Sequence, residues 1–236
     1  MRVSRPWLLA IACCLSAVRL CGAQDLTVIG KVALEGGANQ STAIATVVWL
    51  APMADPTPVA PMHAVLAQRN KTFEPHLLVV TRGSTVEFPN HDPWFHNVFS
   101  LFNGKRFDLG LYEAGISRTV HFDREGVSFI FCNIHPEMSA VVVVLSSPYF
   151  ATTNKQGDFT IPDVPAGRYM LHVWNESAQP ATLQALSREV QLSDSSHSLG
   201  TIRVEVTRAA SIPHKNKYGQ DYEPPSPNNP VYVQPQ

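Results

Sequence analysis

Residues 127–145 read VSFIFCNIHPEMSAVVVVL, two apolar runs separated by a short polar loop. The runs at 127–131 and 140–145 are rich in β-branched and aromatic side chains, which favour strands. The loop between them carries a thiol at Cys132, an imidazole at His135 and a thioether at Met138, all within seven residues. The stretch therefore predicts two strands whose connecting loop can direct three metal-binding side chains toward one point.

The rest of the chain follows the same pattern of short apolar runs, and no long helical stripe occurs. Charged residues make up only 16% of the sequence. A proline-rich stretch at 52–61 predicts a linker, and the glycine-punctuated segment 101–117 predicts a loop. Further strands are expected near residues 28–32, 43–50, 64–68, 77–80, 86–88, 119–122, 159–164, 169–173, 190–192 and 202–206. The predicted fold class is all-β.

The N-terminus has the layout of a secretory signal peptide. Arg2 and Arg5 precede an apolar run at 7–18, and small residues follow at 21–23. That run is too short for a stable membrane anchor, and the residues before Cys14 and Cys21 fit a lipidation site poorly. We therefore expect residues 1–23 to be removed and the mature protein to be periplasmic or secreted, without a membrane span.

Removing this leader changes the cysteine and charge counts. It takes away Cys13, Cys14 and Cys21, so Cys132 is left without a partner for an intramolecular disulfide. Such a cysteine is either a small buried core residue or a metal thiolate. The leader also carries three of the 18 basic residues, which leaves 15 against 19 acidic ones. This balance does not suggest a nucleic-acid-binding surface.

A second imidazole lies upstream, at His96, beyond the strand expected at 86–88. Two histidines, a thiolate and a weak thioether form the ligand set of a mononuclear copper electron-transfer site. His91 lies five residues before His96 and competes for the same role, although the pattern favours His96. Each residue alone has an ordinary structural explanation, but together they predict one copper ion held by His96, Cys132, His135 and Met138.

The loop resembles the copper loop of the cupredoxins, and its C-x2-H-x2-M spacing is similar to that of the amicyanins. The resemblance covers roughly residues 62–145 and includes His96-Asn97-Val98 after Phe88-Pro89-Asn90. It implies a Greek-key sandwich at 61–146. It also implies that His135 lies near the surface as a route for electrons, and that Asn97 links the two ligand loops through hydrogen bonds.

The flanking segments resemble carboxypeptidase-regulatory-like, transthyretin-type β-sandwich modules. The resemblance rests on the pattern of glycines and apolar residues at 152–173, together with the segments 30–32 and 46–48. It implies a second, discontinuous sandwich made of residues 24–60 and 147–207, with the cupredoxin unit inserted into it. The polar, proline-rich tail at 208–236 is expected to be extended or disordered.

These expectations define an exported type 1 copper protein that carries single electrons to or from an unidentified redox protein. A copper storage or delivery protein remains an alternative, as does a surface interaction module with a vestigial site. An enzyme is not expected, because a trinuclear centre needs further histidine clusters and a binuclear site needs a second cysteine.

Overall fold

The structure is a computed structural model that describes residues 25–36, 45–54, 57–101, 104–207 and 214–222. The predicted signal peptide at 1–23 lies outside these residues. The described part of the chain is built almost entirely of strands, with one short helix, α1 (Pro180–Leu186), that begins at a proline. This confirms the all-β class expected from the sequence. No helix among the described residues is long and apolar enough to cross a membrane.

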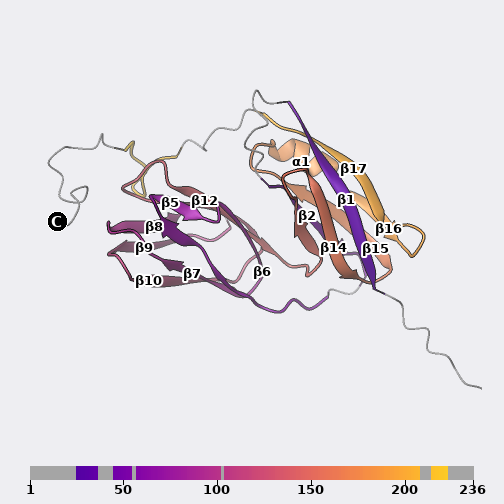
Figure 1. The fold of residues 1–236 in the computed structure, drawn as a ribbon, viewed down its shortest axis with the longest axis horizontal. Coiled ribbons are helices and arrows are strands. Elements are labelled where there is room, and N and C mark those ends of the chain that lie inside the picture. The colour runs from indigo at the N-terminus through magenta and orange to yellow at the C-terminus, as the bar shows by residue number, and fades with distance from the viewer. Residues whose placement is uncertain (1–24, 37–44, 55–56, 102–103, 208–213, 223–236) are drawn as a thin grey trace, which may run out of the picture.

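The strands form two sandwiches that lie side by side (Figure 1). The first pairs a five-stranded sheet in the order β6-β12-β11-β8-β9 with a three-stranded sheet in the order β10-β7-β3. A short hairpin, β4-β5, lies beside it. The bounds are β3 His63–Val65, β4 Ala67–Arg69, β5 Thr72–Glu74, β6 Leu77–Thr81, β7 Ser84–Pro89, β8 His96–Ser100, β9 Phe107–Tyr112, β10 Ser117–Phe122, β11 Gly126–Phe131 and β12 Ser139–Leu145.

The second sandwich takes strands from both sides of the first in the sequence. Its sheets have the orders β14-β1-β17 and β13-β2-β15-β16. The chain therefore forms β1 and β2 of the second sandwich, then all strands of the first sandwich, and then the remaining strands of the second. The bounds are β1 Leu26–Glu35, β2 Val47–Pro52, β13 Phe150–Thr152, β14 Asp158–Val164, β15 Gly167–Trp174, β16 Arg188–Leu192 and β17 Ser198–Glu205. The resemblance of this unit to carboxypeptidase-regulatory-like modules stays a prediction.

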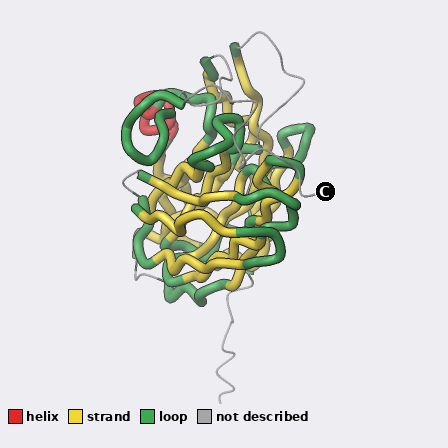
Figure 2. The backbone as a smooth tube through the Cα atoms, turned by 90° about the vertical axis from the view of Figure 1, so that its left-hand side faces the viewer, coloured by secondary structure: helices red, strands yellow, loops and turns green. Residues whose placement is uncertain are grey.

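Strand β12 explains why the sandwiches pack together. Its residues are almost uniformly buried, although a strand with one solvated face would alternate. Ala140, Val142 and Val144 point into the core of the first sandwich. The intervening residues, Val143 among them, form a separate cluster with β2 of the second sandwich. The continuous apolar run thus reflects a strand covered on both faces. Figure 2 shows from a second direction that strands make up most of the described chain, with the short helix at its edge.

One sequence-based expectation about this region is wrong. Segment 101–117 was expected to be a loop, but its middle forms β9, an edge strand paired with β8. Gly110 lies inside the strand at a φ of 71°, and the register with β8 shifts between Asn97 and Phe99. The glycine therefore occupies an irregularity in a strand, where its freedom at positive φ is required, and does not mark a loop.

Candidate metal centre

The ligand loop, residues 132–138, joins two neighbouring strands at one end of the five-stranded sheet. β11 and β12 pair up to Phe131 and Ser139, so the loop begins where their ladder ends. The Cys132 N–H donates to the carbonyl oxygen of Met138 at 3.3 Å, and the Met138 N–H donates to that of His135 at 3.0 Å. These two bonds fold the loop back on itself and bring its side chains close to each other.

His96 reaches the same place from the next strand. It is the first residue of β8, which neighbours β11 through the pairing of Phe99 with Phe131. His96 and Cys132 are fully buried, and His135 is 2% exposed. The competing candidate, His91, is exposed and is not part of the cluster. The structure therefore places His96, and not His91, beside Cys132 and His135.

The ligand atoms of these three residues form a compact triangle. The Nδ1 atoms of His96 and His135 lie 3.1 Å apart, and the Cys132 sulfur lies 3.9 Å and 3.6 Å from them. The point equidistant from all three atoms of such a triangle is about 2.1 Å from each of them. Bonds from a first-row ion such as zinc measure about 2.0–2.1 Å to imidazole and about 2.3 Å to thiolate. The three side chains therefore fit a bound metal ion.

Met138, the fourth expected ligand, is fully buried in the same core cluster as Cys132. Its backbone is bonded to both His135 and Cys132, which fixes it at the end of the loop. Coordination by its thioether stays a prediction.

Burial determines the charge state of the cluster without metal. Desolvation raises the pKa of the Cys132 thiol, although backbone N–H groups of Asn97, Ile134 and His135 donate to the sulfur and partly oppose this. Desolvation also lowers the pKa of His135 to about 4. It lowers the pKa of His96 as well, against the opposing effect of a nearby carboxylate. At neutral pH both imidazoles are therefore neutral and ready to bind metal, while the thiol must lose a proton.

That carboxylate belongs to Asp92, a functional residue that the sequence reasoning missed. Its Oδ2 atom accepts a hydrogen bond from Nε2 of His96 at 2.8 Å, so Nδ1 is left to face the cluster. The backbone N–H groups of Asn70 and Lys71, both at positive φ in the β4-β5 turn, donate to the same carboxylate at 2.6 Å and 2.8 Å. A carboxylate that orients a ligating histidine in this way fixes its tautomer. The available signal was an acidic residue four positions before the candidate ligand.

The pKa of Asp92 is accordingly low. Burial acts to raise it, but the hydrogen bonds from Lys71, His96 and Asn70 outweigh that effect. The group is an anion at neutral pH and keeps a negative charge beside the outer nitrogen of His96.

Asn97 links the two ligand regions through hydrogen bonds, as the resemblance implied, because its backbone N–H, next to His96, donates to the sulfur of Cys132. Its side-chain N–H donates to Oδ1 of Asp108 at 2.7 Å, and Oδ2 of Asp108 accepts from Lys217 at 2.8 Å. The backbone N–H of Lys217 donates to Asn133 in the ligand loop at 2.9 Å. The side-chain link therefore passes through an aspartate and a lysine from the C-terminal segment.

The expected position of His135 near the surface is wrong. The residue is only 2% exposed, so its ring is not open to solvent as a route for electrons would be. Phe95, one residue before His96, is 43% exposed and contributes apolar surface near the site. Its neighbour Trp94 lies under the ammonium of Lys71, 4.8 Å from the ring centre.

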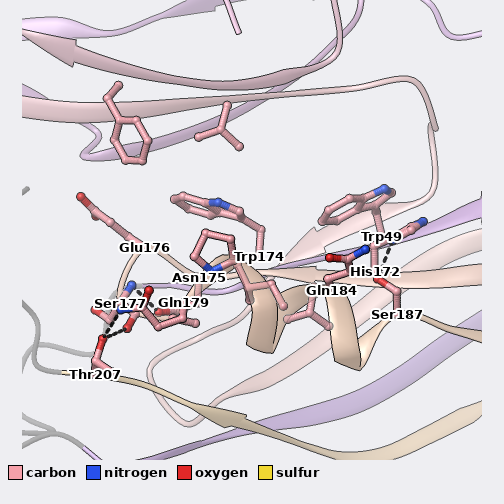
Figure 3. A pocket seen from close by; sticks show the side chains of 16 residues that line it. Trp49, His172, Trp174, Asn175, Glu176, Ser177, Gln179, Gln184, Ser187 and Thr207 are labelled. Atoms are coloured by element: carbon pink, nitrogen blue, oxygen red, sulfur yellow. Dashed lines mark hydrogen bonds between the residues drawn. The ribbon is translucent and has the colours of Figure 1, made fainter. Parts of the chain in front are cut away.

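A separate pocket of about 510 Å³ lies between the two sandwiches and includes none of the four expected ligands. Figure 3 shows Trp49 and Trp174 on its wall, with Trp49 stacked against His172 at a ring distance of 5.0 Å. Phe129 of β11 lines it from the first sandwich. This pocket is therefore a feature of the junction between the sandwiches and not of the metal centre.

Comparison with known proteins finds no matching family model and no matching curated sequence. Among solved structures, a purple cupredoxin from Nitrosopumilus maritimus is similar at 26% identity and a TM-score of 0.32, over 35% of this chain and 99% of that chain. Amicyanin from Paracoccus versutus is 21% identical at a TM-score of 0.34, over 41% of this chain and 91% of that chain.

A copper-containing nitrite reductase from Thermus scotoductus SA-01 is 19% identical at a TM-score of 0.34, over 48% of this chain and 28% of the reductase. The chain thus spans little more than a quarter of that enzyme. All three similarities cover less than half of the present chain. The case for a metal therefore rests on the geometry of the three ligand side chains.

Proposed function

We propose that the protein binds one copper ion through His96, Cys132 and His135, with Met138 as a weak fourth ligand, and serves as a one-electron carrier. The observation that supports this proposal most strongly is the buried triangle of two imidazole nitrogens and one thiol sulfur. Thiolate and thioether suit Cu(I), and imidazole suits Cu(II), so this ligand set supports both oxidation states in one geometry.

The chain contributes positioning and electrostatics. When bound, copper supplies a reversible one-electron couple. The protein holds the ligands on the ends of paired strands, so that they need to move little between oxidation states. Backbone N–H groups, including that of Asn97, donate to the sulfur and stabilise its anionic form. Burial excludes water from the cluster, which also tunes the reduction potential.

The proposal includes export and the absence of an enzymatic role. The leader at 1–23 would direct the chain to an oxidising compartment, where metal coordination would protect the thiol of Cys132. The mature sequence lacks the second cysteine and the extra histidine clusters of catalytic copper proteins, and the redox partner is an unidentified protein.

Copper storage or delivery is the second candidate, and the burial of His135 favours it. A store needs affinity and a protected site, whereas a carrier needs a short path to its partner. A carrier must be oxidised and reduced repeatedly without losing copper, so reversibility separates the two functions.

Titration of the mature chain with Cu(II), followed by visible absorption, tests the proposal. We expect an intense thiolate-to-copper band that saturates at one equivalent, bleaches with a mild reductant and returns with an oxidant. Cys132→Ser should abolish the band in a folded protein. His96→Gln should strongly weaken it, whereas the matched control His91→Gln should leave it unchanged.

Each contrary result has a distinct meaning. A band that forms once and cannot be regenerated would favour storage. No band at all, or a band that survives Cys132→Ser, would contradict the copper–thiolate site itself.

A further inference from the structure

The C-terminal segment 214–222 lies against the ligand loop, although it is 84 to 90 residues away from its partners there. It is the short yellow segment beside the first sandwich in Figure 1, whereas the preceding strand β17 belongs to the second sandwich. We call residues 214–222 the strap. The polar composition of residues 208–236 predicts an extended or disordered tail. The contacts that hold residues 214–222 against the ligand loop cannot be deduced from composition.

Two contacts join the strap to Phe131, where β11 ends, and to Cys132, where the ligand loop begins. The hydroxyl of Tyr222 donates to the backbone carbonyl of Cys132 at 2.9 Å. The ring of His214 stacks on Phe131, the last residue of β11, with 3.8 Å between ring centres and an angle of 15°. His214 also packs edge-on against Tyr222 at 5.3 Å, so the two strap residues support one another.

Lys217 supplies two further contacts. Its backbone N–H donates to Asn133 of the ligand loop at 2.9 Å, and its ammonium pairs with Asp108 at 2.8 Å. The side chains of Lys217 and Asp108 are 21% and 41% exposed, so the pair is partly shielded from water. Because Asp108 also accepts from Asn97, next to His96, Lys217 connects the ligand loop through Asp108 to strand β8.

The Tyr222 hydroxyl is protonated at neutral pH, as an ordinary phenol is, and can donate a hydrogen bond. Desolvation raises the pKa of this phenol above its usual value. The carbonyl that it binds is that of the cysteine whose sulfur completes the ligand triangle. Its hydrogen bond therefore restrains the backbone at the residue that carries the thiol.

We propose that the strap is a closure over the ligand loop, which holds the loop in its ligand-binding geometry and restricts access to the Cys132 sulfur, with Lys217 and Tyr222 as positioning residues. Opening requires the strap to lift from Phe131, Cys132 and Asn133 together. The closed strap then slows metal entry and exit, whose rates are limited by the rate at which the strap opens. The inference depends on the proposed function only for the identity of the metal, because thiol access is a property of the metal-free chain.

The test measures the rate at which metal-free protein reacts with an aromatic disulfide reagent under native conditions. A chain ending at Thr207 lacks the strap and should react at least tenfold faster than the mature full-length chain. The double variant Lys217→Met, Tyr222→Phe keeps the chain length and should react several-fold faster. Hydrogen exchange at residues 132–135 should accelerate in parallel.

Lys215→Met is the matched control, because Lys215 pairs only loosely with Asp221 inside the strap, at 3.8 Å, and both side chains are largely exposed. It should react at the rate of the unaltered protein. If the shortened chain does not fold, as judged by its circular dichroism, the double variant decides the question.

Equal thiol reactivity in the double variant and the unaltered protein would overturn the strap proposal, whatever the copper titration shows. Conversely, failure to form the copper–thiolate band would contradict the proposed function and leave the thiol-access result intact. In the copper-loaded protein, loss of copper to a chelator should be accelerated by the same double variant and not by Lys215→Met.

Discussion

Asp92→Asn tests whether the buried carboxylate beside His96 matters for the metal site. In the native protein Oδ1 accepts from Asn70, and Oδ2 accepts from both Lys71 and His96. An amide has one oxygen. Placed at the position of Oδ2, it keeps two of these bonds and turns a donor toward Asn70; placed at the other position, it keeps only one.

At least one charge-assisted hydrogen bond is therefore lost in either orientation. Such a bond contributes about 1.5–3 kcal/mol, so we expect the free energy of unfolding of the metal-free protein to fall by about that amount. The ligand His96 also loses the negative charge at its outer nitrogen. Changes of this kind lower metal affinity by about 10- to 100-fold.

Urea unfolding of the metal-free protein measures the first effect, and competition for copper with a chelator of known affinity measures the second. The matched control is Asp123→Asn, because Asp123 is exposed and pairs with Lys105 at the surface. Solvent screens an exposed ion pair strongly, so this variant should change stability little and copper affinity not at all. If Asp92→Asn bound copper as tightly as the control does, the role assigned to Asp92 would be refuted.

Three further predictions concern protons and packing. Copper binding at pH 7 should release about one proton, since only the thiol of Cys132 must ionise while both imidazoles are already neutral. Calorimetry in buffers of different ionisation enthalpy measures the number of protons released. Release of two or three protons would contradict the neutral state of the imidazoles. The hydrogen bond to Glu176 raises the pKa of His76, so this pair should stabilise the fold fully below pH 6.5 and lose its contribution as the pH rises through the raised value. Glu176→Gln should flatten that part of the stability–pH profile, and an unchanged profile would rule the pair out as its source. Leu145→Ala, in the cluster between the sandwiches, should lower the free energy of unfolding by about 2–5 kcal/mol, as measured with urea. Ile29→Ala, at an exposed position, should lower it little. Equal losses in the two variants would show that the cluster is not a packed core.

The proximity of the Cys132 and His135 side chains could be predicted from the sequence because the information that determines it is local. The spacing of Cys132 and His135, between two strand-forming runs, determines how the loop returns to the sheet. His96 follows from chemistry, since one further imidazole completes a trigonal set. The pattern already favoured His96 over His91, and the structure places His96 in the cluster and leaves His91 exposed.

The two-sided burial of β12 was visible as a continuous apolar run, but its partner on the outer face was not. A run such as residues 140–145 indicates burial without saying what covers it. The partner, β2, lies nearly a hundred residues earlier in the chain, and tertiary packing alone brings it there. The discontinuous second unit was inferred from resemblance, and the strand pairing now gives its actual neighbours.

The residues around the ligands were the hardest to predict. Asp92 acts through a turn 21 and 22 residues earlier, and Lys217 acts on a loop 84 residues earlier. No periodicity or spacing rule relates such positions. The burial of His135 was missed for a related reason, because exposure depends on everything that packs over a residue and not on the local sequence.

A crystal structure of the copper-loaded protein, with copper located by its anomalous scattering, tests the central claim most directly. We predict one strong peak inside the triangle of His96, Cys132 and His135, within bonding distance of the sulfur and both Nδ1 atoms. A peak on exposed histidines, or a Cys132 side chain directed away from both imidazoles, would contradict the account.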